Sequence, residues 1–261
     1  MNGQPMAQPV QWSERRSPQF EPALRALTTV VLPIGSTEQH GPHLPVQVDT
    51  LLASEVAQRA AARTDPRAPM LVLPPLWVSL AEHHMRMAGT LTLDVPTMHA
   101  FIRCVVLSLQ RQGYRRVLLL NGHGGNIAAL STIADQLAIE TAMPVVAATY
   151  WLVAGDAFAP ILQAQSGLLH ACEAETSMLM HLRPDLVNLA AAGPIAARPS
   201  GFLEPAGTHR WRQIAHWSCD GIVGVPQQAS AAKGERLLGA AVDALLACLA
   251  APSFWSEDPP P

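Results

Sequence analysis

The chain has 261 residues, 49% of them hydrophobic and 14% charged, and a formal net charge of −3. This length suits a single large α/β domain, and the lack of a basic stripe excludes the kind of surface that holds a nucleic-acid backbone. Met1 to Pro22 are polar where a secretory signal needs an apolar stretch, and no apolar run reaches the ~18 residues of a membrane helix. We therefore expect a cytoplasmic protein that binds neither nucleic acid nor a membrane. The four cysteines form no C-x-x-C pair, which fits reduced thiols in that compartment.

Strand and helix signals alternate along the chain. Short apolar runs bounded by Gly or Pro predict buried strands at residues 30–34, 70–73, 117–120 and 145–151. Helical periodicity predicts helices at residues 51–63, 96–112, 127–139, 172–182 and 231–250, with Asn126 as an N-cap and Gly113 after a C-terminus. This alternation predicts an α/β fold, a layered sandwich whose mostly parallel central sheet is covered by helices on both faces.

The domain organisation follows from the same elements. We expect a polar N-terminal segment over residues 1–23, one domain over 24–250 and a Pro-rich tail over 251–261. Residues 184–228 are irregular, and loops this long are usually functional or bridge subunits.

Acidic residues and histidines follow the predicted strands. Glu38, His40 and Asp49 come after the first strand, His123 comes directly after the third, and His170 and Glu175 follow the fourth. Ligands of an open parallel sheet bind outside the carboxyl ends of its strands, so these segments can converge. The predicted metal ligands are two imidazoles and three carboxylates, namely Glu38, His40, Asp49, His123 and Glu175. Such a set suits Zn, Mn or Fe(II).

Charge counting favours two divalent ions, because three carboxylates leave a positive excess that favours bound hydroxide, the nucleophile of a hydrolase. Each residue alone has a plainer interpretation. Asp49 could be a helix N-cap, His123 a hydrogen-bonded loop residue, and the glycines at 122–125 a phosphate loop, although the Lys of a P-loop is missing. His43, His99, His181, His209 and His216 are by default structural or exposed. Only the convergence of the set points to a metal site.

Three motifs carry a resemblance to a known family. Residues 33–45 with Asp49 closely resemble the opening motif of the creatininase (creatinine amidohydrolase) family, 121–126 resemble its second motif, and 170–177 its third. Weaker similarity covers 84–90 and 221–234, and the match runs from about residue 24 to 250. The resemblance implies a layered α/β sandwich, metal ligation with Asp49 bridging two ions, and homo-oligomers, often hexamers.

The same resemblance implies roles beyond the ligands. His170 falls on the family's proton-transfer residue, and we expect Glu173 to assist it by a hydrogen bond that fixes its tautomer. We expect the substrate to be contacted by His84, Gly124 and Trp151.

Two departures bear on the substrate. Creatinine-hydrolysing members have a Glu ligand where this chain has Gly125, and a Trp-Asp pair where it has Ser166 and Gly167. Glu175 could replace the lost ligand, but creatinine is expected to be a poor substrate. The leading prediction is hydrolysis of a C–N amide bond, cyclic or formamide-like, in a small molecule. Trimming of small peptides and a non-catalytic, metal-bearing structural or regulatory role are the alternatives.

Overall fold

The structure is a computed structural model that describes residues 8–193, 208, 210–251 and 254–255. Its centre is a parallel sheet in the order β2-β1-β3-β4, formed by β1 (Thr29–Ile34), β2 (Met70–Val72), β3 (Arg116–Asn121) and β4 (Val145–Thr149). Successive strands are joined by α2 (Val48–Ala61), α3 (Val95–Arg111) and α4 (Ile127–Thr141). Each connection is a crossover, as parallel neighbours require.

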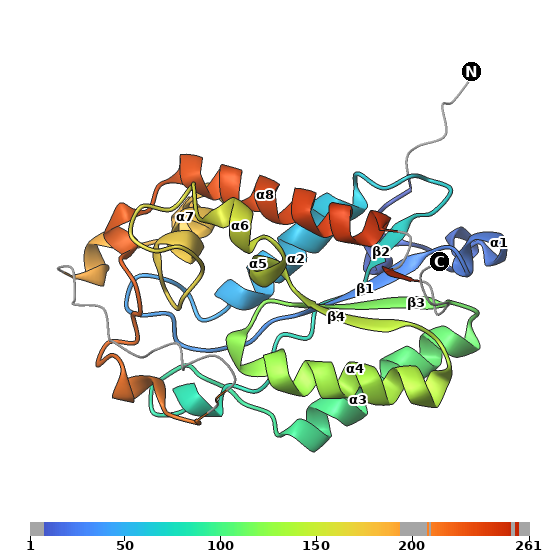
Figure 1. Ribbon diagram of the computed structural model, residues 1–261, viewed down its shortest axis with the longest axis horizontal. Helices are drawn as coiled ribbons and strands as arrows, with labels where there is room; N and C mark the ends of the chain where they lie inside the picture. Colours follow the sequence, from blue (N-terminus) through green and yellow to red (C-terminus); the bar gives the residue numbers. More distant parts are fainter. Residues whose placement is uncertain (1–7, 194–207, 209, 252–253, 256–261) are drawn as a thin grey trace.

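Helices cover both faces of the sheet, which confirms the predicted layered α/β fold (Figure 1). Strand β1 is buried along its whole length because its alternate side chains serve two cores. Val30, Leu32 and Ile34 pack with α3 and α4, whereas Val31 packs with α2 and the long helix α8 (Ala231–Ala250). Helix α7 (Glu173–Leu182) lies against α8 on that second face.

The described part of the N-terminal segment packs on the sheet and does not stand apart from it. It contains η1 (Trp12–Glu14), η2 (Ser17–Gln19) and α1 (Pro22–Arg25). Gln11 forms a bridge with Val72 of β2, and the Trp12 ring lies 5.4 Å from the Tyr114 ring. At the other end of the chain, the Arg116 guanidinium lies 5.9 Å from the centre of the Trp255 ring.

Short elements fill the carboxyl end of the sheet. They are η3 (Glu82–His84), η4 (Gly124–Asn126), α5 (Tyr150–Val153), α6 (Gly155–Phe158), η5 (Pro184–Leu186), η6 (Leu189–Ala192), η7 (Ile214–His216) and η8 (Pro226–Gln228). The irregular segment 184–228 is described except for residues 194–207 and 209. No helix in the described ranges is both long enough and apolar enough to cross a membrane.

Two local predictions were wrong. The fourth strand ends at Thr149, and Tyr150 and Trp151 turn into α5 because both rings are buried in the core beneath α8. Asn126 precedes α4 but does not cap it with its side chain. Its Oδ1 instead accepts from the Leu80 amide at 3.2 Å, so it ties two loops together at the carboxyl end of the sheet.

Candidate metal centre

All five predicted ligands meet at the carboxyl end of the sheet. Glu38 and His40 lie in the loop after β1, Asp49 in the first turn of α2, His123 directly after β3, and Glu175 in the first turn of α7. Their ligand atoms form two groups that share one residue, Glu38–Asp49–His123 and His40–Asp49–Glu175, and a third group joins Glu38 and His40 to His170. No ligand is more than 3% exposed. The described residues thus offer two adjacent sites with Asp49 in both.

The distances explain why Asp49 belongs to both groups. Asp49 Oδ1 lies 3.1 Å from His40 Nε2, while its other oxygen, Oδ2, lies 3.0 Å from His123 Nδ1. Glu38 Oε2 is 2.9 Å from His123 Nδ1, and Glu175 Oε1 is 3.8 Å from His40 Nε2. One carboxylate therefore presents one oxygen to each group, which is the geometry of a bridging ligand.

Backbone carbonyls orient the two imidazoles. His40 Nδ1 lies 3.1 Å from the Glu38 carbonyl and His123 Nε2 lies 3.0 Å from the Leu80 carbonyl. A carbonyl only accepts, so both nitrogens donate, and a neutral ring then has its lone pair on the opposite nitrogen. Those lone pairs, on His40 Nε2 and His123 Nδ1, face carboxylate oxygens. Contacts between acceptors at about 3 Å are favourable only with a cation or a proton between them.

The unpaired atoms of the site fit a divalent metal. Glu38 Oε2, His40 Nε2 and Asp49 Oδ2 are buried and have no hydrogen-bond partner among the described residues, which is rare for buried polar atoms. Burial raises the pKa of the Glu38 carboxyl, while burial of His123 is outweighed by Glu38 and Asp49, which raise its pKa to about 10. A concentration of buried negative charge with imidazole donors suits Zn, Mn or Fe(II).

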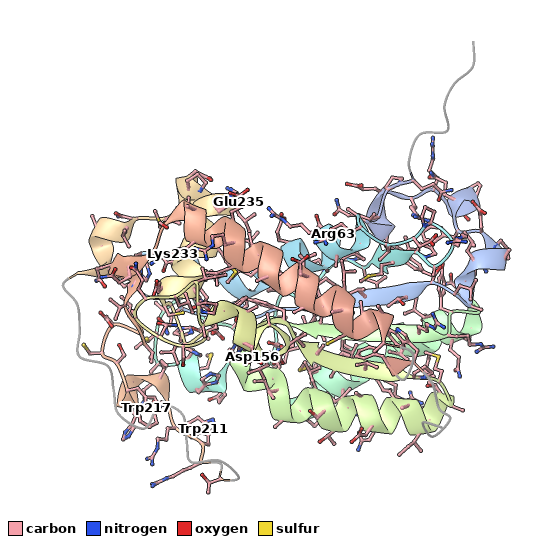
Figure 2. The ribbon with its side chains drawn as sticks, turned by 45° about the horizontal axis from the view of Figure 1, so that its top comes forward. Arg63, Asp156, Trp211, Trp217, Lys233 and Glu235 are labelled. Atoms are coloured by element: carbon pink, nitrogen blue, oxygen red, sulfur yellow. The ribbon has the colours of Figure 1, made fainter. Side chains whose placement is uncertain are left out.

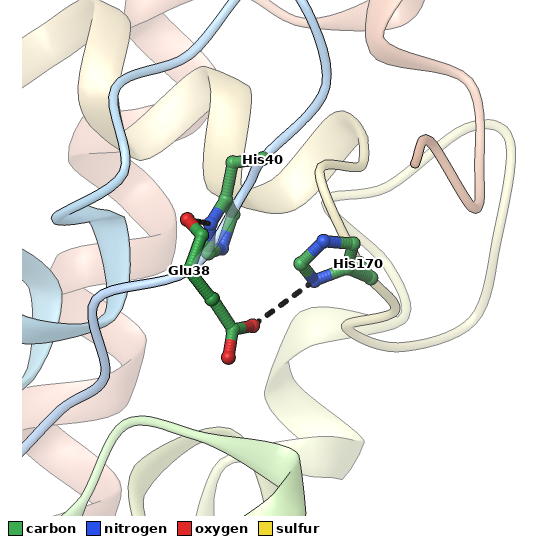
Figure 3. A group of neighbouring side chains, drawn as sticks. All are labelled: Glu38, His40 and His170. Atoms are coloured by element: carbon green, nitrogen blue, oxygen red, sulfur yellow. Dashed lines mark hydrogen bonds and ion pairs between the residues drawn. The ribbon is translucent and has the colours of Figure 1, made fainter. Parts of the chain in front are cut away.

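His170 lies beside the ligands on a separate loop (Figure 3). Its Nε2 donates to the Gln39 carbonyl at 2.9 Å, and its Nδ1 faces Glu38 Oε1 at 3.5 Å. Backbone hydrogen bonds in both directions with Val223 fix the loop, and the next residue, Ala171, has a positive φ of 50°. Burial, followed by the charge of His40, lowers the pKa of His170 well below its ordinary value. Burial therefore favours the neutral ring, whose Nδ1 is the nitrogen that faces Glu38.

Glu173 does not lie where the sequence placed it. Both of its oxygens accept from the Gln163 amide, one also accepts from the Ala164 amide at 2.8 Å, and Oε1 pairs with Lys233 Nζ at 2.6 Å. The expected hydrogen bond to His170 is therefore wrong. Residues two apart on an α-helix point about 200° apart, so with Glu175 toward the site, Glu173 must face α8. Its contacts join α7, α8 and the loop before His170.

The three residues expected to contact substrate all line one cavity of about 1510 Å³. Gly124 and Trp151 border it, and a Cβ at Gly124 would meet open space. His84 also borders the cavity, but its Nε2 faces Glu38 Oε1 at 3.4 Å. The cavity reaches the segment that carries Trp211 and Trp217, which Figure 2 shows at one end of the molecule.

Sequence reasoning missed Gln39. Its Oε1 accepts from the Gly41 amide at 2.9 Å, so its amide NH2 lies 2.9 Å from His84 Nδ1 and 3.0 Å from His170 Nε2. Gly221 lets this side chain pass, because a Cβ at residue 221 would collide with Gln39 Oε1. No local pattern signalled this role, because the partner residues His84 and His170 lie on other loops.

Comparisons with known proteins agree with this geometry. The family model described as "Creatininase: Creatinine amidohydrolase" matches residues 13–249. The chain is 30% identical over 239 residues to the "Mycofactocin precursor peptide peptidase" of Mycobacterium ulcerans (strain Agy99), covering 88% of this chain and 87% of that protein.

Solved structures match over a similar extent. "Creatininase Mn" aligns with a TM-score of 0.79 and 26% identity, covering 93% of this chain and 98% of its own. A creatininase mutant described as "Zn-Zn type" aligns with a TM-score of 0.78, also at 26% identity and with the same coverage. The two buried ligand groups are consistent with a binuclear site like those of the Zn and Mn creatininase structures.

Proposed function

The chain belongs to the creatininase family, and on this premise we propose that it is a metal-dependent amidohydrolase that cleaves a C–N amide bond in a small molecule. The observation that carries the proposal is the pair of buried ligand groups that share Asp49 beside a large cavity. A site closed by protein ligands on every side would suit a structural metal, but Glu38, Asp49, His123 and Glu175 all border the cavity. This openness argues against the non-catalytic alternative.

Each part of the site has a role in this proposal. Glu38 and His123 would hold one divalent ion, His40 and Glu175 a second, and Asp49 both. Two such ions supply an activated water near neutral pH and polarise a carbonyl group.

His170 would serve as the proton-transfer residue. A neutral imidazole with its Nε2–H fixed on the Gln39 carbonyl has a free Nδ1 that can take a proton and return it to the leaving nitrogen. Glu173, which is turned away from the ring, would act only by holding α7 and the preceding loop in place.

A small non-peptide amide, cyclic or formamide-like, is the first candidate substrate. Trp151 and Gly124 would form part of its pocket. Creatinine itself is expected to be turned over poorly, since Gly167 borders the cavity without a side chain and Ser166 is exposed.

A short peptide is the second candidate. A cavity of about 1510 Å³ exceeds the ~300–1,000 Å³ typical of small-molecule sites, and its walls extend from the ligand groups to Trp211. The peptidase name of the Mycobacterium ulcerans relative points the same way.

A substrate screen tests the proposal and separates the two candidates. Protein loaded with Zn or Mn would be incubated with lactams, formamides, creatinine and a library of short peptides, and released amine would be measured. Asp49→Ala protein treated identically is the background control. Release from lactams or formamides alone selects the first candidate, and release from peptides alone selects the second. No release above the Asp49→Ala background from any member would contradict the amidohydrolase proposal.

A further inference from the structure

His83 lies beside the metal-ligand groups. It has no role in the mechanism proposed above, and it is not part of the sequence motifs described above. It lies on η3, half-buried, next to His84. Its ring stacks on the ring of His123, with the centroids 5.4 Å apart and the planes 22° apart. It also borders the large cavity. His83 therefore lies between a predicted metal ligand and the space where a substrate would bind.

The glycine at position 125 makes room for this ring. A Cβ at Gly125 would lie 2.7 Å from His83 Cε1 and 2.5 Å from the Leu80 carbonyl oxygen, and it would also collide with His123 Nε2. Any side chain at position 125 would thus displace His83 or break the hydrogen bond between His123 and Leu80. The His83 ring therefore occupies its present position only because residue 125 has no side chain.

The polar atoms of His83 are unused. Among the described residues, neither ring nitrogen has a hydrogen bond or an ion pair. Its neighbour His84 is engaged on both sides, by Gln39 at 2.9 Å and by Glu38 at 3.4 Å. Half-buried imidazole nitrogens normally find a partner. The cavity that His83 borders is the space from which a substrate group would reach these nitrogens.

The ring of His84 neighbours the rings of both His83 and His170. The His84 ring is 4.2 Å from that of His83 and 4.5 Å from that of His170, centroid to centroid. A group hydrogen-bonded by His83 would lie beside His123, on which the His83 ring stacks. Proton transfer is proposed for His170, so a different role remains to be found for His83.

We propose that His83 contacts the substrate, with a ring nitrogen hydrogen-bonding a polar group beside the amide bond to be cleaved. The proposal rests on the amidohydrolase function above. It assigns His83 no metal, because His83 belongs to none of the three ligand groups among the described residues.

Two substitutions separate hydrogen bonding from ring stacking. His83→Phe keeps a ring against His123 but removes both nitrogens, and His83→Asn keeps a donor and an acceptor without the stacking ring. His181→Phe, near the end of α7, is the matched histidine control. The protein would be loaded with Co(II), and its metal content, its visible spectrum, and its kcat/KM on the best substrate of the screen would be measured.

We expect His83→Phe to retain the metal content and the Co(II) spectrum of the unmodified protein but to lose about tenfold in kcat/KM, the size of one lost hydrogen bond. His83→Asn should lose less, and His181→Phe nothing. An unchanged kcat/KM in His83→Phe would overturn the proposal. A lost metal ion or a changed spectrum would also overturn it, since His83 would then act through His123.

A second probe keeps the test independent of turnover. Acetohydroxamate, a small amide-like chelator, would be titrated into the Co(II) proteins and followed by absorbance. We expect about tenfold weaker binding to His83→Phe, and equal binding would count against the contact. If the unmodified protein cleaves no amide, the proposed function fails while this titration still decides the role of His83.

Discussion

At the scale of single residues, the carboxylate that Asp49 shares between the two ligand groups leads to a direct prediction of metal content. One oxygen faces each ligand group, so Asp49→Ala should weaken both ions together and reduce the metal content from two ions per chain to well below one. His43 is the control, because it is equally buried but its Nε2 bonds the Thr176 hydroxyl at 3.0 Å. Elemental analysis after purification without chelator measures both. Equal loss in His43→Ala would show that Asp49 is not the bridge.

His170 provides the residue-scale test of proton transfer. His170→Asn should keep both ions and much of the substrate affinity while kcat falls by about 10²–10⁴, the usual contribution of a general acid–base group. Its Nδ1 is close enough to Glu38 that a ligand role is the competing interpretation. Measuring metal content and kcat on one preparation separates the two. A missing ion would make His170 a ligand, and full metal with normal turnover would make it structural.

The pKa values of the site's imidazoles predict how the effect of bound metal on protein stability changes with pH. Burial would lower the pKa of His123, but Glu38 and then Asp49 raise it to about 10, and Asp49 likewise raises that of His40. In chelated protein, the stabilisation from these protons is complete below the ordinary histidine pKa of about 6.5 and is lost as the pH rises toward about 10. Bound metal replaces those protons.

The gap in Tm between metal-loaded and chelated protein should therefore widen as the pH rises from 6.5 toward 10. A widening of about 2–4 °C is expected for each kcal/mol of linkage in a chain of this size. Differential scanning fluorimetry with and without EDTA across this range measures it. A gap that is constant or narrows with pH would contradict the predicted exchange of protons for metal.

At the scale of elements, α8 contains two glycines with opposite environments. A Cβ at Gly234 would collide with the Ser177 carbonyl of α7, whereas a Cβ at Gly239 would meet nothing within 4 Å. Gly234→Ala should therefore destabilise by about 1–3 kcal/mol through overpacking. Gly239→Ala should stabilise by about 0.5–1 kcal/mol because Ala loses less backbone entropy in a helix.

Urea unfolding of the two alanine variants beside the unmodified protein measures both changes. The pair controls for helix propensity, since the same substitution is made in the same helix. Changes of the same sign at the two positions would show that α7 and α8 are not packed as closely as the structure has them.

At the scale of elements, the sequence predicted those helices and strands whose bounds are fixed by residues close together in the chain. Continuous apolar runs and glycines at helix ends lie within a few residues, and they placed all four strands and the principal helices within a few residues of their observed bounds. The turn at Tyr150 depends on burial under α8, which is eighty residues away in the chain. The direction of Glu173 depends on Lys233. Such long-range partners leave no periodic signal.

The site divides in the same way. Ligand residues that follow strands could be predicted, because the carboxyl ends of parallel strands share one edge. The residues that contact these ligands could not be predicted. Gln39, the Leu80 carbonyl and His83 take their roles from contacts across loops, and only the folded arrangement brings His83 against His123.

At the scale of the whole molecule, large apolar side chains are exposed on the loops around Thr37 and Glu38, and we call Val46, Trp77 and Leu91 the loop patch. They are between 37% and 55% exposed. Thr37 holds two of their loops together, since its Oγ1 donates to the Trp77 carbonyl and its own carbonyl accepts from the Leu91 amide. Exposed apolar side chains on neighbouring loops favour an interface at this place.

We expect the loop patch to contact a second copy of the chain in a homo-oligomer, with the family resemblance favouring a hexamer. Light scattering at micromolar concentration should give a mass several times 27.9 kDa. The double variant Trp77→Asp and Leu91→Asp should lower that mass, because two buried and unpaired carboxylates would oppose association. Ile139→Asp is the control, since Ile139 is 83% exposed on α4 and outside the patch. A monomeric unmodified protein would refute the oligomer, and an unchanged mass in the double variant would place the interface elsewhere.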